Sequence, residues 1–215
     1  MAEEPPGSVR QQQAAATRQQ LLAAACEVFE ERGYQGTSVG AITNRADTAH
    51  GTFYLYFKNK EDAFCQVMES VILEELAVTT EAAEGRELSP RQGIEVVIRA
   101  FIGFYGPHIG LWRAVVEGML QSARIRELWL ELRRAFIHHI AAGLEEQCRA
   151  GIVRPLDPLM SAHALGSMVE WFAFAFFELH EPPGADGELG PGNEHAVDVL
   201  VDLWTHAVYG ELPAD

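Results

Sequence analysis

The chain has 215 residues, 48% of them hydrophobic and 22% charged, which suffices for one extended domain or two small ones with a buried core. No uninterrupted apolar run reaches the roughly 18 residues that a membrane span needs, and the start MAEEPPGSVR carries no signal-peptide pattern, so we expect a cytoplasmic protein. The formal net charge of -15 argues against general nucleic-acid binding, but residues 8–65 carry six cations and six anions, so the excess lies almost entirely beyond them.

The first predicted helix ends at Gly33, because glycine readily adopts the left-handed conformation that terminates a helix. The apolar residues before it recur at helical spacing: Leu21, Leu22, Ala25, Cys26, Val28 and Phe29. Thr37 then precedes Val39, Ile42 and Ala46, and we expect its hydroxyl to cap a second helix of about two turns.

A third helix is predicted from the spacing of Ala49, Phe53 and Phe57, which recur every four residues and so share one face. Its other face carries short polar groups, a glycine and phenolic hydroxyls, namely His50, Gly51, Thr52, Tyr54 and Tyr56. Such a face suits a helix that is pressed into a groove, where donors meet base edges or phosphates. Two short helices separated by a tight turn are typical of a helix-turn-helix.

The pattern G-Y-x-G-T-S-V-x-x-I-x-x-x-A, followed by G-T-F-Y-x-Y-F-x-N-K-E-x-x-F, resembles the amino-terminal DNA-binding domain of TetR-family transcriptional regulators over residues 18–67. The resemblance implies an all-α fold, in which a three-helix helix-turn-helix domain is joined through a long fourth helix to an all-helical ligand-binding and dimerisation domain. We therefore expect a disordered arm at 1–10, the DNA-binding domain at 11–65 and the ligand-binding and dimerisation domain at 66–215.

The same resemblance places His50 and Gly51 near base edges, and Thr37, Tyr54, Tyr56 and Lys60 near phosphates. The full set expected at DNA is Thr37, Ser38, His50, Gly51, Thr52, Tyr54, Tyr56, Lys58 and Lys60. Position 50 departs from the family, which often has lysine there, and histidine has a shorter reach and a weaker charge. Lys58 and Lys60 are the only lysines in the chain, and a solvated helix start is the alternative interpretation of this pair.

Beyond residue 59, where Asn59 is the expected cap, the chain is predicted to be helical throughout, without strand-like alternation. The expected helices span about 60–82, 90–105 after the Ser89-Pro90 start, 111–119, 123–150, 158–180 and 194–209. A glycine- and proline-rich stretch at 181–193 is predicted to be a mobile loop.

The helix at 158–180 is apolar nearly all round, which indicates burial on several sides. Together with the last helix it fits the pair that forms a four-helix bundle across a twofold dimer axis in the family that the chain resembles. The residues expected at this homodimer interface are Phe172, Phe176, Val197, Val201 and Trp204. The alternative is an ordinary core helix in a monomer.

Large apolar side chains in the second part of the chain can line a pocket for an apolar or aromatic small molecule, or can equally fill a dry core. The candidate ligand-binding residues are Phe101, Phe104, Tyr105, Trp112, Met119, Trp129, Phe136, Met168, Trp171 and Phe172. We expect no cofactor and no metal, because His138 and His139 are adjacent and point about 100° apart on a helix. Cys26, Cys65 and Cys148 are expected to be core residues, with a redox sensor as the alternative.

These features predict a ligand-responsive, DNA-binding transcriptional regulator. We expect a repressor that binds a pseudo-palindromic operator as a dimer and is released by a small apolar or aromatic effector. The alternative is a helical ligand carrier or a protein-interaction dimer without operator binding. An enzyme is a distant third class, because the sequence has neither a phosphate-binding loop nor a nucleophile elbow.

Overall fold

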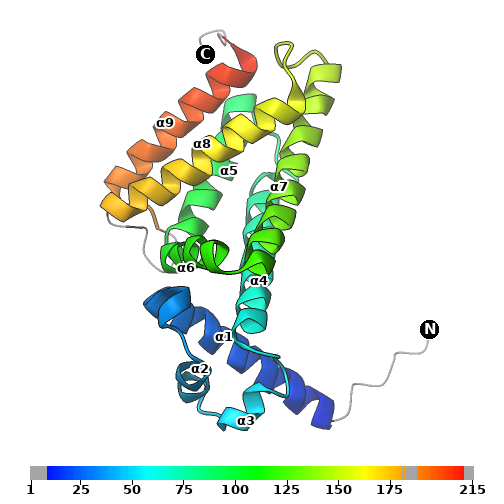
Figure 1. Cartoon of the computed structure of the whole chain (residues 1–215). Helices are drawn as coiled ribbons and strands as arrows, with labels where there is room; N and C mark the ends of the chain where they lie inside the picture. Colours follow the sequence, from blue (N-terminus) through cyan, green and yellow to red (C-terminus); the bar gives the residue numbers. More distant parts are fainter. Residues whose placement is uncertain (1–8, 181, 183–187, 211–215) are drawn as a thin grey trace, which may run out of the picture. The chain divides into compact units, whose positions relative to one another are not determined.

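The computed structural model describes residues 9–180, 182 and 188–210, and over these ranges the chain contains helices and no strand (Figure 1). The predicted all-α fold is confirmed. The helices are α1 (Val9–Gly36), α2 (Val39–Arg45), α3 (His50–Phe53), α4 (Lys60–Ala83), α5 (Pro90–Tyr105), α6 (Ile109–Gln121), α7 (Ala123–Arg149), α8 (Pro158–Leu179) and α9 (Pro191–Tyr209). Eight of the ten residues of the arm predicted at 1–10 and six of the thirteen residues of the loop predicted at 181–193 lie outside the described residues. The last helix begins at Pro191, within the predicted loop and three residues before the predicted start at 194.

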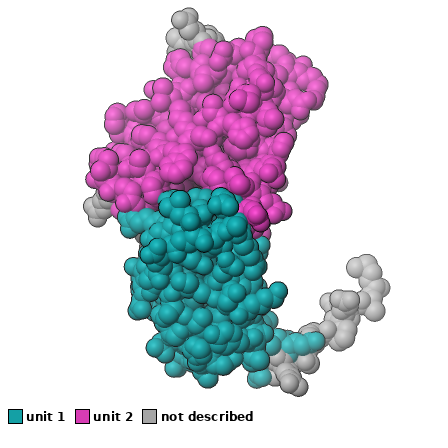
Figure 2. All heavy atoms as spheres, viewed as in Figure 1, with its two compact units in different colours: residues 1–70, 110–126 teal, residues 71–109, 127–215 magenta. Residues whose placement is uncertain are grey.

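The chain forms two compact units (Figure 2). Unit 1 comprises residues 1–70 and 110–126, and unit 2 comprises residues 71–109 and 127–215. The segment 110–126, far from the helix-turn-helix in sequence, packs into unit 1, where a side chain at Gly118 would lie 3.2 Å from the ring of Phe64. The predicted helix-turn-helix therefore has a partner that its local sequence does not reveal.

The core of unit 1 is built on aromatic rings from α1, the α1–α2 turn and α4. Phe29 and Phe64 meet edge to face with centroids 4.6 Å apart, and Tyr34 packs on Phe64 at 4.9 Å. The chain can turn back to make these contacts because Gly33 has φ 68 and ψ 178, which ends the regular part of α1. The predicted helix end at Gly33 is confirmed.

The cap of α2 differs from the prediction. Ser38, and not Thr37, is the N-cap, with its hydroxyl accepting the Ala41 N–H at 3.2 Å. Thr37 lies one residue too early and is 3% exposed, and its hydroxyl donates to the carbonyl oxygens of Gly33 and Val28. The predicted cap of α4 is correct, because Asn59 Oδ1 accepts the Asp62 N–H at 2.8 Å.

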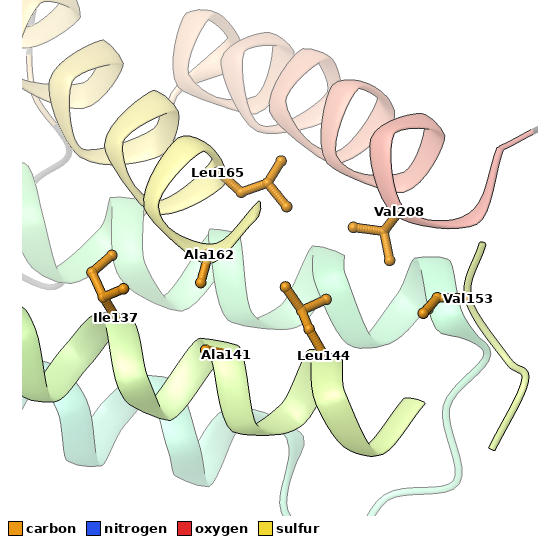
Figure 3. Packing of buried hydrophobic residues seen from close by; sticks show 7 residues of the cluster. All are labelled: Ile137, Ala141, Leu144, Val153, Ala162, Leu165 and Val208. Atoms are coloured by element: carbon orange, nitrogen blue, oxygen red, sulfur yellow. The ribbon is translucent and has the colours of Figure 1, made fainter. Parts of the chain in front are cut away.

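The core of unit 2 joins α7, α8 and α9 (Figure 3). Its buried side chains are Ile137, Ala141, Leu144, Val153, Ala162, Leu165 and Val208. The helix α5 packs against α9, and its start is fixed by a capping box in which Ser89 and Gln92 bond to each other's backbone N–H groups. Local sequence thus sets the ends of the helices, and apolar burial sets their packing.

By length and composition alone, the helix α8 could cross a membrane. Polar residues nevertheless interrupt its apolar stretches. Only 28% of its most apolar window is buried among the described residues. One such helix is weak evidence for a membrane span, because core and interface helices of soluble proteins share these properties. The exposed apolar side of α8 requires another explanation.

Gly93 lies at an open position of α5, where a substitution tests helix propensity without changing the packing. An added Cβ there would meet no atom within 4 Å, and Gly93 N–H already bonds to the Ser89 carbonyl at 2.9 Å. We expect Gly93→Ala to raise the free energy of unfolding by roughly 0.8–1 kcal/mol, because alanine has the higher helix propensity. Thermal and urea denaturation measure this change. Gly85→Ala is the control and should destabilise, since Gly85 has φ 68 although its surroundings are open.

Candidate DNA-binding surface and ligand cavity

The outer side of α3 is exposed and polar. His50 and Gly51 are exposed, and Tyr54 is 53% exposed with its ring 5.5 Å from that of His50. An added Cβ at Gly51 would meet no atom within 4 Å, so the packing of unit 1 does not require glycine there. The opposite side is anchored by Phe53 and Phe57, both buried and 5.1 Å apart. A short, firmly anchored helix that presents small polar groups can approach a nucleic-acid groove closely.

The other residues expected at DNA fall into two groups. Ser38 is exposed at the N-cap of α2, and Thr52 and Tyr56 are half-buried beside the exposed face of α3. Thr37 is excluded as a phosphate ligand, because its side chain is buried and its hydroxyl proton is used inside unit 1. Of the residues expected at DNA, Ser38 is therefore the first in the chain whose side chain is exposed.

The two lysines differ in their surroundings. Lys60 Nζ donates to the Tyr34 carbonyl at 2.8 Å and lies 4.5 Å from the centre of the Tyr34 ring, and desolvation in this position lowers the pKa of Lys60. Lys58 has an exposed side chain, while its backbone N–H donates to Asp62 Oδ2 at 2.9 Å. Lys58 is thus free to reach a phosphate, whereas Lys60 fastens the start of α4 to the α1–α2 turn.

The segment 110–126 braces the helix-turn-helix from within unit 1. Glu117 Oε2 accepts the Gln35 N–H at 3.2 Å, and an added Cβ at Gly33 would lie 2.7 Å from the same oxygen. An added Cβ at Gly110 would lie 2.4 Å from the Glu30 carbonyl oxygen, so α6 and α1 touch through backbone. Gly33 and Gly110 are the residues whose small size allows this contact. The sequence alone does not distinguish them from other glycines in helices.

Unit 2 contains a partly open cavity of about 550 Å³, lined by residues of α4, α5, α7, α8 and α9. It is lined by Thr79, Thr80, Ala83, Leu88, Ser89, Pro90, Gly93, Ile94, Val97, Ile98, Phe101, Phe136, His139, Ile140, Gln147, Ile152, Gly166, Val169, Trp204 and Tyr209. This volume lies within the range of small-molecule sites, and the lining is mostly apolar. The cavity can therefore hold an organic molecule of moderate size.

Two of the ten candidate ligand residues, Phe101 and Phe136, line this cavity. Trp112 and Met119 belong to unit 1, and the six that lie elsewhere in unit 2 are Phe104, Tyr105, Trp129, Met168, Trp171 and Phe172. Sequence reasoning favoured aromatic residues and so missed the aliphatic and polar part of the lining. The apolar residues of α5 lie mainly on one side of the helix, and this pattern could have pointed to Ile94, Val97 and Ile98 as lining residues.

The polar groups of the cavity include one internal pair. Tyr209 Oη donates to Gln147 Oε1 at 2.8 Å, which leaves the amide N–H groups of Gln147 for another acceptor. Glu75, one helical turn before the cavity residue Thr79, is buried, and Glu75 Oε2 has no hydrogen-bond partner among the described residues. Burial raises the pKa of Glu75 to about 8.

The predicted dimer residues on α9 point into unit 2. Val197 and Val201 are 0% and 1% exposed in the single chain, and Trp204 lines the cavity and packs on the core. Val197 and Val201 are therefore not accessible to a second copy, whereas Trp204 is half-buried. Phe172 and Phe176 are half-buried and stack at 5.3 Å. The apolar side chains that do face outward on these helices include Leu159, Met160, Trp171, Val199 and Leu203.

Two protein families match the chain. The family described as "Bacterial regulatory proteins, tetR family" matches residues 21–65, and the family described as "Transcriptional regulator EthR, C-terminal domain" matches residues 94–210. The chain is 27% identical over 193 residues to the HTH-type transcriptional regulator EthR of Mycolicibacterium smegmatis, and the match covers 89% of this chain and 86% of that protein.

Solved structures share the fold. A TetR-family regulator from Mesorhizobium loti has a TM-score of 0.72 and 20% identity, covering 91% of this chain and 98% of that one. FadR from Bacillus subtilis, in complex with stearoyl-CoA, has a TM-score of 0.69 and 19% identity, covering 90% and 99% of the two chains. From its two family matches and the helix-turn-helix in unit 1, the chain belongs to the TetR family of DNA-binding transcriptional regulators.

Proposed function

We propose that this regulator is a homodimeric repressor that binds a pseudo-palindromic operator and is released by an apolar small molecule held in unit 2. The observation that carries the proposal is the presence of an exposed, polar α3 surface in unit 1 and an apolar cavity in unit 2 of the same chain. Residues 11–65 are proposed as the DNA-binding domain and 66–215 as the effector and dimerisation domain, with the segment 110–126 bracing the former. A cytoplasmic location follows from this function.

His50, Gly51 and Thr52 are proposed to read base edges, because they occupy the exposed start of α3. The residues proposed to bind phosphates on either side of these base edges are Ser38, Tyr54, Tyr56 and Lys58. Lys60 is proposed to act mainly as a positioning residue, since Lys60 Nζ donates to the Tyr34 carbonyl and is partly desolvated beside the Tyr34 ring. Thr37 is left out of the proposed contacts because its hydroxyl is buried.

The lysine assignment has a direct test. We expect Lys58→Ala to weaken binding to all DNA sequences alike and to reduce the slope of log affinity against log salt by about 0.9 for each phosphate that the lysine neutralises. Fluorescence anisotropy of labelled duplexes over a salt series measures the slope. Lys60→Ala is the comparison, and it should lower thermal stability more than it changes the slope. Equal slopes for Lys58→Ala and the unchanged protein would show that Lys58 does not touch a phosphate.

The dimer is proposed to form through the outward sides of α8 and α9, where Trp171 is 49% exposed and Leu203 is 53% exposed. A twofold axis between two such pairs makes a four-helix contact in which each patch meets its own copy. This arrangement would cover the apolar side of α8 that the single chain leaves open.

The proposed role of the effector is tested by measuring whether a cavity ligand releases the protein from operator DNA. FadR of Bacillus subtilis was solved with stearoyl-CoA, which shows that this fold can hold a lipid-like ligand. A labelled operator duplex bound by the protein should be released when a ligand fills the cavity, and analytical ultracentrifugation should find two chains on each operator. Binding by single chains, or operator binding that no cavity ligand changes, would contradict the proposed mechanism.

A further inference from the structure

The turn that carries Lys58 is held by a carboxylate at the start of α4. The Lys58 N–H donates to Asp62 Oδ2 at 2.9 Å, and the Asp62 N–H donates to Asn59 Oδ1 at 2.8 Å. These two hydrogen bonds run in opposite directions across the same turn, so together they restrict its backbone. The direction in which the exposed Lys58 side chain leaves the surface therefore depends on the position of the Asp62 carboxylate.

Asp62 has a partner from a distant part of the sequence. Arg124, in the first turn of α7, donates from Nη2 to Asp62 Oδ1 at 3.0 Å. One carboxylate oxygen thus binds the guanidinium, and the other binds the Lys58 N–H. The Gln66 amide also approaches Asp62 Oδ2, but at 3.4 Å this contact is long for a hydrogen bond. The Asp62 carboxylate therefore links Arg124 to the backbone of Lys58.

A second contact fixes the start of α7 at the same place. Ser122 Oγ donates to Glu61 Oε1 at 2.5 Å and accepts the Ile125 N–H at 3.2 Å. The Ser122 hydroxyl thus caps α7 and also binds the residue that precedes Asp62. Because its helix start is held in this way, Arg124 loses less conformational freedom when it pairs with Asp62 than an arginine on a mobile segment would.

The two partners of this ion pair differ in exposure. The side chain of Asp62 is 11% exposed, whereas that of Arg124 is 51% exposed. Burial alone would raise the pKa of Asp62, but hydrogen bonds from the Lys58 N–H and the Arg124 guanidinium outweigh it and hold that pKa below its usual range. A mostly buried carboxylate that loses its cation keeps the desolvation penalty without the compensating attraction. Removal of the Arg124 guanidinium should therefore displace the Asp62 carboxylate from the turn.

We propose that Arg124 is a positioning residue for DNA binding, which holds Asp62 so that the Lys58 side chain meets a phosphate. This inference rests on the proposed phosphate contact of Lys58. Arg124 belongs to residues 66–215, for which the sequence predicted effector binding and dimerisation, yet it lies in unit 1 with the helix-turn-helix. A residue outside 11–65 thus contributes to DNA affinity through another residue. The competing role is direct contact of the half-exposed Arg124 guanidinium with a phosphate.

A double-mutant cycle on the salt dependence of DNA binding separates the two roles. Fluorescence anisotropy with one labelled duplex gives the slope of log affinity against log salt for the full chain, Lys58→Ala, Arg124→Ala and the double variant. Each single variant should reduce the slope by about 0.9 for each bound chain, because both lose the same phosphate contact. The double variant should have the slope of Lys58→Ala alone. A further reduction in the double variant would show that Arg124 acts on DNA by itself, and would overturn the proposal.

Arg126→Ala is the matched control for the loss of charge. Arg126 is exposed, lies two residues further along α7 and so about 200° round the helix, and has no ion pair within the described residues. Its removal should leave the slope unchanged, whereas Arg124→Lys, which keeps the cation, should regain at least half of the slope that Arg124→Ala loses. Equal slopes for Arg124→Ala and Arg126→Ala would contradict a specific role of Arg124. Urea denaturation of each variant confirms that folded protein is compared.

Amide hydrogen exchange at Lys58, followed by nuclear magnetic resonance, tests the contact without DNA. Exchange of the Lys58 N–H should be at least tenfold faster in Arg124→Ala and unchanged in Arg126→Ala. Unchanged exchange in both variants would show that Arg124 does not hold this turn, and would overturn the proposal. The two proposals fail in different ways. If Lys58→Ala leaves the salt slope unchanged, the phosphate contact is wrong and the inference fails with it, whereas a slope lowered by Lys58→Ala and not by Arg124→Ala overturns the inference alone.

Discussion

Leu203→Glu is expected to convert the regulator to a monomer and to weaken operator binding by about 100-fold. Leu203 is 53% exposed on α9, so a carboxylate there disturbs little within the chain. At a twofold interface the substitution removes apolar contact from both copies and brings two like charges together. The affinity falls because a dimer binds its second half-site at high effective concentration and a monomer does not.

Sedimentation velocity and operator anisotropy measure the two effects. Leu73→Glu is the matched control, since Leu73 is 60% exposed on α4 and the same change there should leave the dimer intact. Val201→Glu is unsuitable as a test, because Val201 is buried in its own chain and a charge there would unfold unit 2. An intact Leu203→Glu dimer would move the interface away from α9.

Glu75 is expected to make the chain less stable as pH rises from 5 to 8. Its pKa in the folded protein is about 8, against 4.5 for the reference group, so between these values the folded state holds a proton that the unfolded state has lost. The stability that this group contributes is therefore fully present below pH 4.5 and is lost as pH rises through 8. The expected change is roughly 3–4 kcal/mol, at about 1.4 kcal/mol for each pH unit.

Urea denaturation at several pH values measures this dependence. Glu75→Gln keeps the shape of the side chain but cannot ionise, so its stability should vary much less over the same pH range. Glu74→Gln is the control, because Glu74 is exposed on the same helix and should leave the dependence unchanged. If Glu75→Gln and the unchanged protein lose stability in parallel, the pH dependence has another origin.

The helices and their ends followed from local chemistry and were predicted well from the sequence. Gly33 ends the regular part of α1, Asn59 caps α4, and Ser89-Pro90 opens α5, because glycine, side-chain acceptors and proline each favour one backbone geometry. The cap of α2 was misplaced by one residue. Thr37 and Ser38 have equivalent hydroxyls, and only packing decides that Thr37 turns inward.

The sides of α8 and α9 could not be assigned from sequence. α8 is apolar over most of its circumference, and α9 carries the apolar Val199 and Leu203 beside its polar residues. The apolar character of these side chains therefore does not distinguish Val201, which faces the core, from Leu203, which faces outward. Most of the lining of the cavity was missed for a related reason. Sequence records which side chains are large, but a cavity is space that side chains leave unfilled, and that depends on how α5, α7 and α9 approach one another.

Selection of bound duplexes from random DNA by the purified full chain tests the central claim most directly. A dimer with one helix-turn-helix in each chain should enrich an inverted repeat whose half-sites are related by the twofold axis, and His50→Ala should alter the preferred base at one position in each half-site. Enrichment of no inverted repeat, with binding that depends only on salt, would contradict the assignment of this chain as an operator-binding dimer.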